Sequence, residues 1–204
     1  MRRTARPLLL VVGVALAVAA CGSGQGSGAP SASASGTASG ADPLARAEAA
    51  AGRLGKTLRA RLEEVLKASG PAAAVAVCAA EAQALGTQIA SETGVRVGRA
   101  SLRLRNPADA GPDWVAAWLR AQGERPAEGV APVRELVDGP TGKVARVLKP
   151  IAVDKPCLAC HGQPAELAAE VTPALAATYP DDAAVGYREG DLRGALWAEL
   201  PVGR

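Results

Sequence analysis

Residues 130–161 read VAPVRELVDGPTGKVARVLKPIAVDKPCLACH, and this stretch combines a strand pattern with a chemical motif. Residues 130–137 and 143–153 are rich in Val, Leu and Ile, and they flank the turn-forming sequence DGPTG at 138–142. Two apolar runs around a Gly- and Pro-containing turn predict a pair of antiparallel strands. The second strand should lead directly into the motif CLACH at 157–161.

The CLACH motif is typical of a site at which haem is bonded covalently. Cys157 and Cys160 would form thioethers with the haem vinyl groups, and the adjacent His161 would bind the iron. A thioredoxin-like cysteine pair is an alternative, but it would give His161 no special role. A zinc site built from Cys78 with the three motif residues is a second alternative. We favour one haem c, because haem attachment demands a histidine at this position, whereas zinc loops tolerate many residues there.

The second axial ligand of such an iron must come from elsewhere in the sequence. His161 is the only histidine and Met1 the only methionine among 204 residues, so the usual partners are missing. Cys78 is a candidate thiolate ligand, because the motif consumes the cysteines with which it could form a disulfide. A lone cysteine on a helix is also a common small core residue. The second axial ligand could therefore also be a Lys, Tyr or Asn side chain or water, or the position could be vacant.

The first 42 residues predict export and attachment to a membrane. Three arginines precede an apolar run at 8–20, which is typical of a signal peptide over residues 1–20. The sequence VAAC at 18–21 resembles a bacterial lipobox, so we expect Cys21 to carry lipid that anchors the protein to a membrane surface, outside the cytoplasm. Cleavage after Ala19, which would leave an unanchored protein, is the alternative. Residues 21–42 are rich in Gly, Ser and Ala and predict a flexible linker to a domain at 43–204.

Charge and composition exclude two function classes. Without the three arginines of the leader, the chain has 20 basic and 20 acidic residues and therefore no net charge. A neutral domain gives no electrostatic reason to expect nucleic acid as a partner. No second histidine and no acid/base constellation accompanies the motif, so we do not expect an enzyme.

Helical and alternating patterns fill the rest of the chain and predict an α+β fold. Apolar residues recur every three or four positions before and after the breaker Ser69-Gly70-Pro71, which indicates an N-terminal pair of helices. Further expected elements are a strand at 95–105, a short helix carrying Trp114 and Trp118, a helix at 164–177 and a strand at 195–200.

Four arginines at 96–105 stand without an acidic residue among them. Haem brings two propionates that need cationic partners, so Arg99 and Arg103 are candidate haem-binding residues. A solvated strand face is an equally good explanation for any one of these arginines.

Four motifs in this order resemble one family. They are VC at 77–78, VGRASLRLRNP at 97–107, CLACHG at 157–162 and YPDDAAVGYREGDLRGA at 179–195. The chain resembles a PAS-like, single-haem c-type cytochrome domain family, some members of which form the sensor region of bacterial signalling proteins. The resemblance implies a PAS-like antiparallel sheet flanked by helices, haem c on Cys157 and Cys160, and axial ligation by His161 and Cys78.

These observations predict a membrane-tethered haem protein that senses redox state or a diatomic gas such as CO or NO. Loss of the Cys78 thiolate on reduction would open a position at the iron for the gas. Since no transmitter sequence follows the domain, we expect a separate signalling or redox partner protein. The alternatives are a single-haem electron carrier and, less favoured, a structural zinc lipoprotein.

Overall fold

The computed structural model describes residues 42–123 and 125–203, and of Cys78 it describes only the backbone. All of these residues belong to one compact unit, Gly40–Arg204. The predicted signal peptide, the lipidation site at Cys21 and the predicted linker up to residue 41 lie outside the described residues. They remain predictions.

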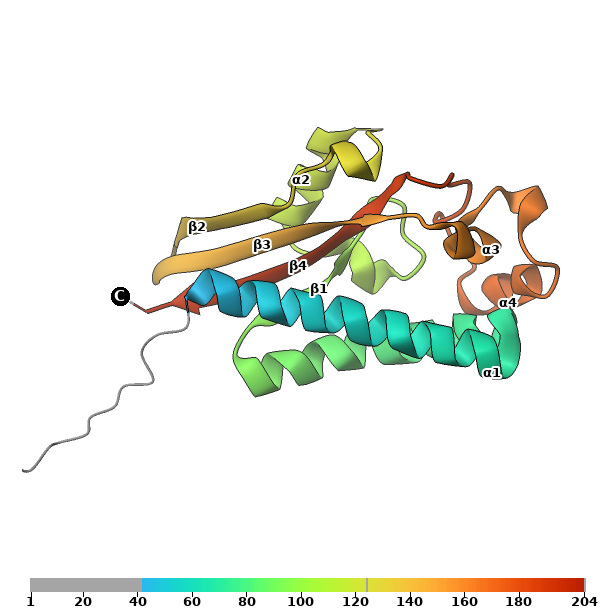
Figure 1. Ribbon diagram of the computed structural model, residues 1–204, viewed down its shortest axis with the longest axis horizontal. Coiled ribbons are helices and arrows are strands. Elements are labelled where there is room, and N and C mark those ends of the chain that lie inside the picture. The colour runs from blue at the N-terminus through green and yellow to red at the C-terminus, as the bar shows by residue number, and fades with distance from the viewer. Residues whose placement is uncertain (1–41, 124, 204) are drawn as a thin grey trace, which may run out of the picture. The chain divides into compact units, whose positions relative to one another are not determined.

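The first element, α1 (Pro43–Thr93), is a helical hairpin (Figure 1). Asp42 caps its start, accepting a 3.0 Å hydrogen bond from the Leu44 amide. At Gly70 the backbone leaves the helical conformation with φ of 80°, a region that only glycine enters freely, and Pro71 then begins the second arm. The predicted helical pair and its breaker are therefore confirmed.

The sheet has four antiparallel strands in the order β1-β4-β3-β2. Its strands are β1 (Arg96–Ala100), β2 (Val133–Gly139), β3 (Gly142–Ala152) and β4 (Leu192–Val202). The β2–β3 pair closes at Gly139 and Gly142, so the predicted hairpin is confirmed. The remaining helices are α2 (Asp113–Gln122), α3 (Leu158–His161) and α4 (Val171–Thr178). The predicted α+β fold, an antiparallel sheet flanked by helices, is confirmed.

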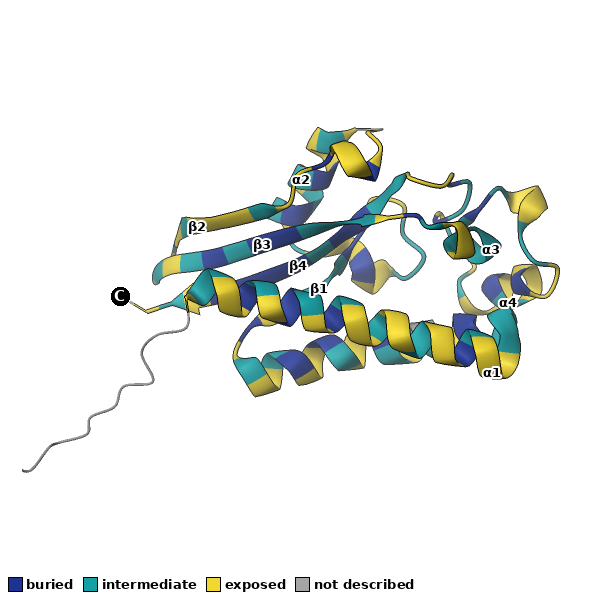
Figure 2. Ribbon diagram, viewed as in Figure 1, coloured by how far each residue is buried: buried dark blue, intermediate teal, exposed yellow. Residues whose placement is uncertain are grey.

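Helices pack on both faces of the sheet because neighbouring strand residues point to opposite sides. Val147 and Ala198 belong to the cluster formed with α1, whereas the adjacent Leu148 and Trp197 belong to the cluster formed with α2. The middle strand β4 is accordingly the most buried, and the edge strand β2 is largely exposed (Figure 2).

Two predicted boundaries were wrong. The strand expected at 95–105 ends at Ala100, because Ser101 turns the chain: the carbonyl oxygens of Arg103 and Arg193 lie 3.0 and 2.9 Å from its hydroxyl oxygen, and its one proton is donated to either of them. The helix expected from 164 begins only at Val171. The preceding residues form a 3₁₀ turn and an extended stretch, in which the Ala168 amide donates to the carbonyl of Ala159.

Among the described residues, no single helix is long and apolar enough to cross a membrane; the bent pair Pro43–Val77 and Ala79–Thr93, taken together, passes the same test by length and composition only.

Candidate functional site

The motif at 157–161 forms a compact helical turn at the end of β3. After β3 the chain makes a 3₁₀ turn at Lys155–Cys157, in which the Cys157 amide donates to the Asp154 carbonyl at 2.8 Å. The helix α3 follows at once and closes with a 2.8 Å hydrogen bond from the Gly162 amide to the Leu158 carbonyl. The side chains of Cys157, Cys160 and His161 are therefore distributed around little more than one helical turn.

The two cysteines of the motif contact different apolar clusters. Cys157 packs with Leu158 against the buried residues Val153, Ala184 and Tyr187. Cys160 packs against a second cluster, which consists of Val75, Val171 and Leu175. The two cysteines of the motif therefore have different apolar neighbours. Among the described residues, no group of three or more His, Cys, Asp or Glu side chains is arranged to hold a metal ion.

His161 is held with one ring nitrogen occupied and the other available. Its Nδ1 lies 2.7 Å from the carbonyl oxygen of Ala184. A carbonyl can only accept, so Nδ1 carries the proton and Nε2 carries the lone pair that binds a metal. Burial, assisted by the positive charges of Arg105 and Arg193, lowers the pKa of His161 to about 3. The imidazole is therefore neutral at physiological pH, which is the form that coordinates iron.

A buried ion pair holds the segment that carries the Ala184 carbonyl. Arg105 Nε donates to Asp182 Oδ2 at 3.0 Å, and Asp182 Oδ1 accepts from the Ala184 amide at 2.8 Å. Arg105 Nη2 also donates to the carbonyl of Cys160 at 2.5 Å. One guanidinium thus ties the motif to the turn that orients His161. Residues 97–107 and 179–195 were identified as motifs in the sequence, but no role was predicted there for Arg105, Asp182 or Ala184.

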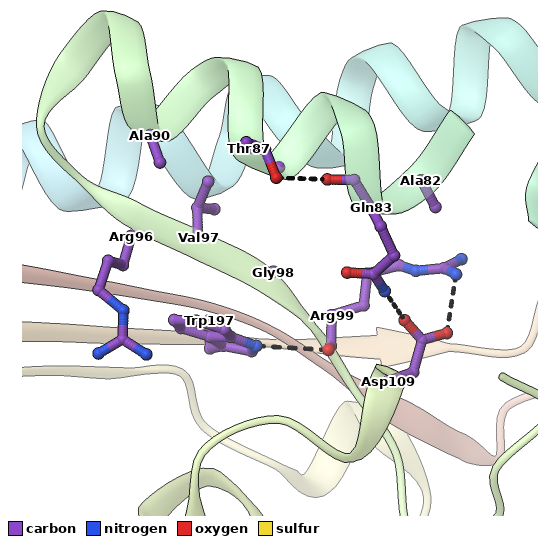
Figure 3. Close-up of a pocket in the computed structure, with 11 residues that line it drawn as sticks. Ala82, Gln83, Thr87, Ala90, Arg96, Val97, Gly98, Arg99, Asp109 and Trp197 are labelled. Atoms are coloured by element: carbon purple, nitrogen blue, oxygen red, sulfur yellow. Dashed lines mark hydrogen bonds and ion pairs between the residues drawn. The ribbon is translucent and has the colours of Figure 1, made fainter. Parts of the chain in front are cut away.

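The two arginines predicted to bind propionates lie in different surroundings. Arg103 lies beside the motif, with its guanidinium carbon 4.3 Å from the ring centre of Tyr187 and its Nε donating to the Ala183 carbonyl. Arg99 instead pairs with the buried Asp109 at 2.8 Å. Asp109 accepts a second hydrogen bond from Gln83, on the second arm of α1 (Figure 3).

Figure 3 shows the cavity that Arg99 faces, which lies between the second arm of α1 and β1 and has a volume of about 190 Å³. Trp197 and Arg96 also line it, whereas none of the three motif residues does. The structure therefore brings Arg103, but not Arg99, next to the CLACH motif.

Cys78 lies in the second arm of α1. Val75, three positions earlier, is part of the cluster that contacts Cys160. The Cys78 side chain is not among the described parts, and its role as a ligand stays a prediction.

The fold and this site define an α+β domain, with an antiparallel sheet between helices, that presents a Cys-x-x-Cys-His turn. More specifically, the chain belongs to the Tll0287-like family, whose model matches residues 37–201. The crystal structure of the cyanobacterial heme-protein Tll0287 is similar to it, with 26% sequence identity and a TM-score of 0.59. That alignment covers 80% of this chain and 99% of the Tll0287 chain. No curated protein matches this chain. These findings agree with the sequence resemblance at the level of a haem-protein family.

Proposed function

We propose that this protein carries one haem c, bonded to Cys157 and Cys160, with His161 as an axial iron ligand. The observation that carries the proposal is the hydrogen bond from His161 Nδ1 to the Ala184 carbonyl, because it leaves Nε2 unprotonated and fixes the ring orientation. The structural relative Tll0287 is a haem protein, which supports the same cofactor here.

The residues around the motif fit a haem better than a zinc ion. The apolar clusters that contact Cys157 and Cys160 offer the dry surroundings that a porphyrin requires. Attachment needs no oxidant, since each thiol adds across a vinyl group, the sulfur bonding to one carbon and the proton going to the other. Tetrahedral zinc would need the sulfurs of both cysteines to converge with His161 and Cys78.

We propose that Cys78 supplies the second axial ligand and that the protein works as a redox or diatomic-gas sensor. The haem would supply an iron that changes valence and binds CO or NO in its ferrous state. The Cys78 thiolate would favour the ferric state, and after reduction by a partner protein it would take up a proton from water and become a neutral thiol, a weaker ligand. Lipid on Cys21 would hold this domain at an extracytoplasmic membrane surface, where it meets a separate signalling or redox partner.

The second candidate function is electron transfer by a single haem. In that case Cys78 stays bound in both redox states and only the valence changes. Cys78 follows Val75, which contacts the cluster of Cys160, by three positions in α1, and this position is compatible with both functions, so spectroscopy must separate them.

The test is the absorption spectrum of protein purified from a host with cytochrome maturation machinery. We expect a red protein whose colour stays with the polypeptide after extraction with acidified acetone. A colourless preparation, or one that binds zinc stoichiometrically, contradicts haem attachment.

The second measurement compares spectra before and after dithionite, with and without CO. A CO adduct of the reduced protein supports the sensor, and unchanged six-coordination without an adduct supports the electron carrier. Cys78→Ala should alter the ferric spectrum, with Ala79→Ser as the neighbouring control. An identical ferric spectrum for Cys78→Ala would exclude thiolate ligation.

A further inference from the structure

Most arginines in the segment 96–105 have their charge matched by a carboxylate. Within residues 96–105, Arg96 pairs with Glu199, Arg99 with Asp109 and Arg105 with Asp182. Arg103 and Arg193 differ: in residues 42–123 and 125–203, no carboxylate oxygen lies within 4 Å of either guanidinium. Two positive charges in this region therefore lack an anionic partner within the described protein.

Both guanidiniums lie against the ring of Tyr187, next to the proposed iron ligand. Their central carbons are 4.3 and 5.3 Å from the ring centre of Tyr187. The Tyr187 ring lies edge-on to His161, with the ring centres 6.3 Å apart. The CLACH motif, Arg103 and Arg193 thus form one site around Tyr187.

The two arginines differ in exposure, because Arg103 is exposed whereas Arg193 is partly buried. Its Nη1 donates to Ser101 Oγ at 2.5 Å and to the Arg103 carbonyl at 3.4 Å, and both acceptors are neutral. Burial lowers the pKa of this guanidinium, which reflects the cost of placing its charge away from water. Asp109 opposes this shift electrostatically, but the hydrogen-bond acceptors of the guanidinium are neutral. A partly buried charge of this kind is costly, whereas a bidentate contact with a carboxylate compensates that cost.

We propose that Arg193 and Arg103 hold the two propionate carboxylates of the haem. The inference rests on the proposed function, and it assigns to Arg193 a role that the sequence suggested for Arg99. Two unmatched guanidiniums correspond to two propionates, and the planar donor fork of arginine fits a carboxylate with two parallel hydrogen bonds. We do not assign a propionate to Arg99, because its guanidinium already forms an ion pair with Asp109.

The test uses the purified haem-loaded protein and its variants Arg193→Gln, Arg103→Gln and Arg193→Lys. Arg99→Gln is the rival variant, and Arg120→Gln, an exposed position on α2, is the control. The readouts are covalent haem content, the propionate bending band in the resonance Raman spectrum and the reduction potential. Covalent haem content reports on the proposed function, and the other two report on this inference.

We expect all variants to keep covalent haem, because the thioethers do not involve these arginines. Arg193→Gln and Arg103→Gln should each shift the propionate band and lower the reduction potential, since removing a positive charge favours the ferric state. Arg193→Lys should have a reduction potential close to that of the wild type, because the positive charge is retained. It should still shift the propionate band, because lysine lacks the planar pair of donors that arginine offers to a carboxylate. Arg120→Gln should change neither.

Three results would overturn the inference while leaving haem attachment intact. They are an unchanged propionate band in Arg193→Gln, a band shift in Arg99→Gln alone, and equal potentials for the Arg193→Gln variant and the wild type. A wild-type protein without haem would instead refute the proposed function itself. If Arg193→Gln does not fold, the same readouts on Arg193→Lys and Arg103→Gln decide the question.

Discussion

Replacing Arg105 with glutamine removes the cation that joins the Cys160 loop to the turn at Asp182. The side chains of this pair are only 12% and 10% exposed, so the change leaves the Asp182 carboxylate buried and uncompensated. Breaking a buried pair in this way typically costs about 3–5 kcal/mol. Arg105 also donates to the carbonyl of Cys160, and that carbonyl loses its charged donor in the variant.

The matched control is Arg59→Gln, because Arg59 forms an ion pair with Asp154 of almost the same length but 63% and 45% exposed. An exposed pair contributes about 0–1 kcal/mol. Urea unfolding followed by circular dichroism should therefore separate the variants. With a denaturant slope of about 1–3 kcal/mol per molar urea, the Arg105→Gln midpoint should fall by about 1 M or more, and the Arg59→Gln midpoint by much less.

A double-mutant cycle with Asp182→Asn tests whether the cost comes from the pair itself. If the charges compensate each other, the double variant should be more stable than the sum of the two single changes implies, by about 0.5–3 kcal/mol. Equal midpoints for Arg105→Gln and Arg59→Gln, or strict additivity in the cycle, would refute the view that this ion pair holds the site together.

Three further predictions concern the core, a close contact and the histidine. Leu148→Ala should lower the unfolding free energy by about 2–5 kcal/mol in chemical denaturation, because Leu148 is fully buried, while the exposed Leu136→Ala should change it by less than about 0.5 kcal/mol. Gly98→Ala should lower the thermal midpoint, because a Cβ there would meet the Trp197 ring at 2.9 Å; an unchanged midpoint would show that the ring moves freely. In haem-free protein, the stability should fall as the pH drops from about 6.5 to about 3, by at most about 1.4 kcal/mol per pH unit from His161. In this pH range the histidine is protonated in the unfolded chain but not in the folded chain. His161→Gln should therefore remove this contribution to the pH dependence of the unfolding free energy.

The sequence alone determined the elements whose signals are local. The helical pair interrupted at Gly70, the β2–β3 hairpin and the CLACH motif each depend on residues within a few positions of one another, and spacing or turn chemistry reveals them. The strand end at Ala100 and the late start of α4 were missed for the opposite reason. Ser101 stops the strand partly through a hydrogen bond to Arg193, 92 positions away, which no local pattern contains.

The partners of the arginines were decided only by tertiary structure. Arg99 and Arg103 look equivalent in the sequence, four residues apart in one basic segment, yet one pairs with Asp109 and the other lies on Tyr187. Arg105 meets Asp182 across 77 positions. Because Coulomb energy depends on distance and burial rather than on sequence separation, the sequence supplied the charged groups, and only the packing of β1, β4 and the segment after α4 determined which of them are neutralised.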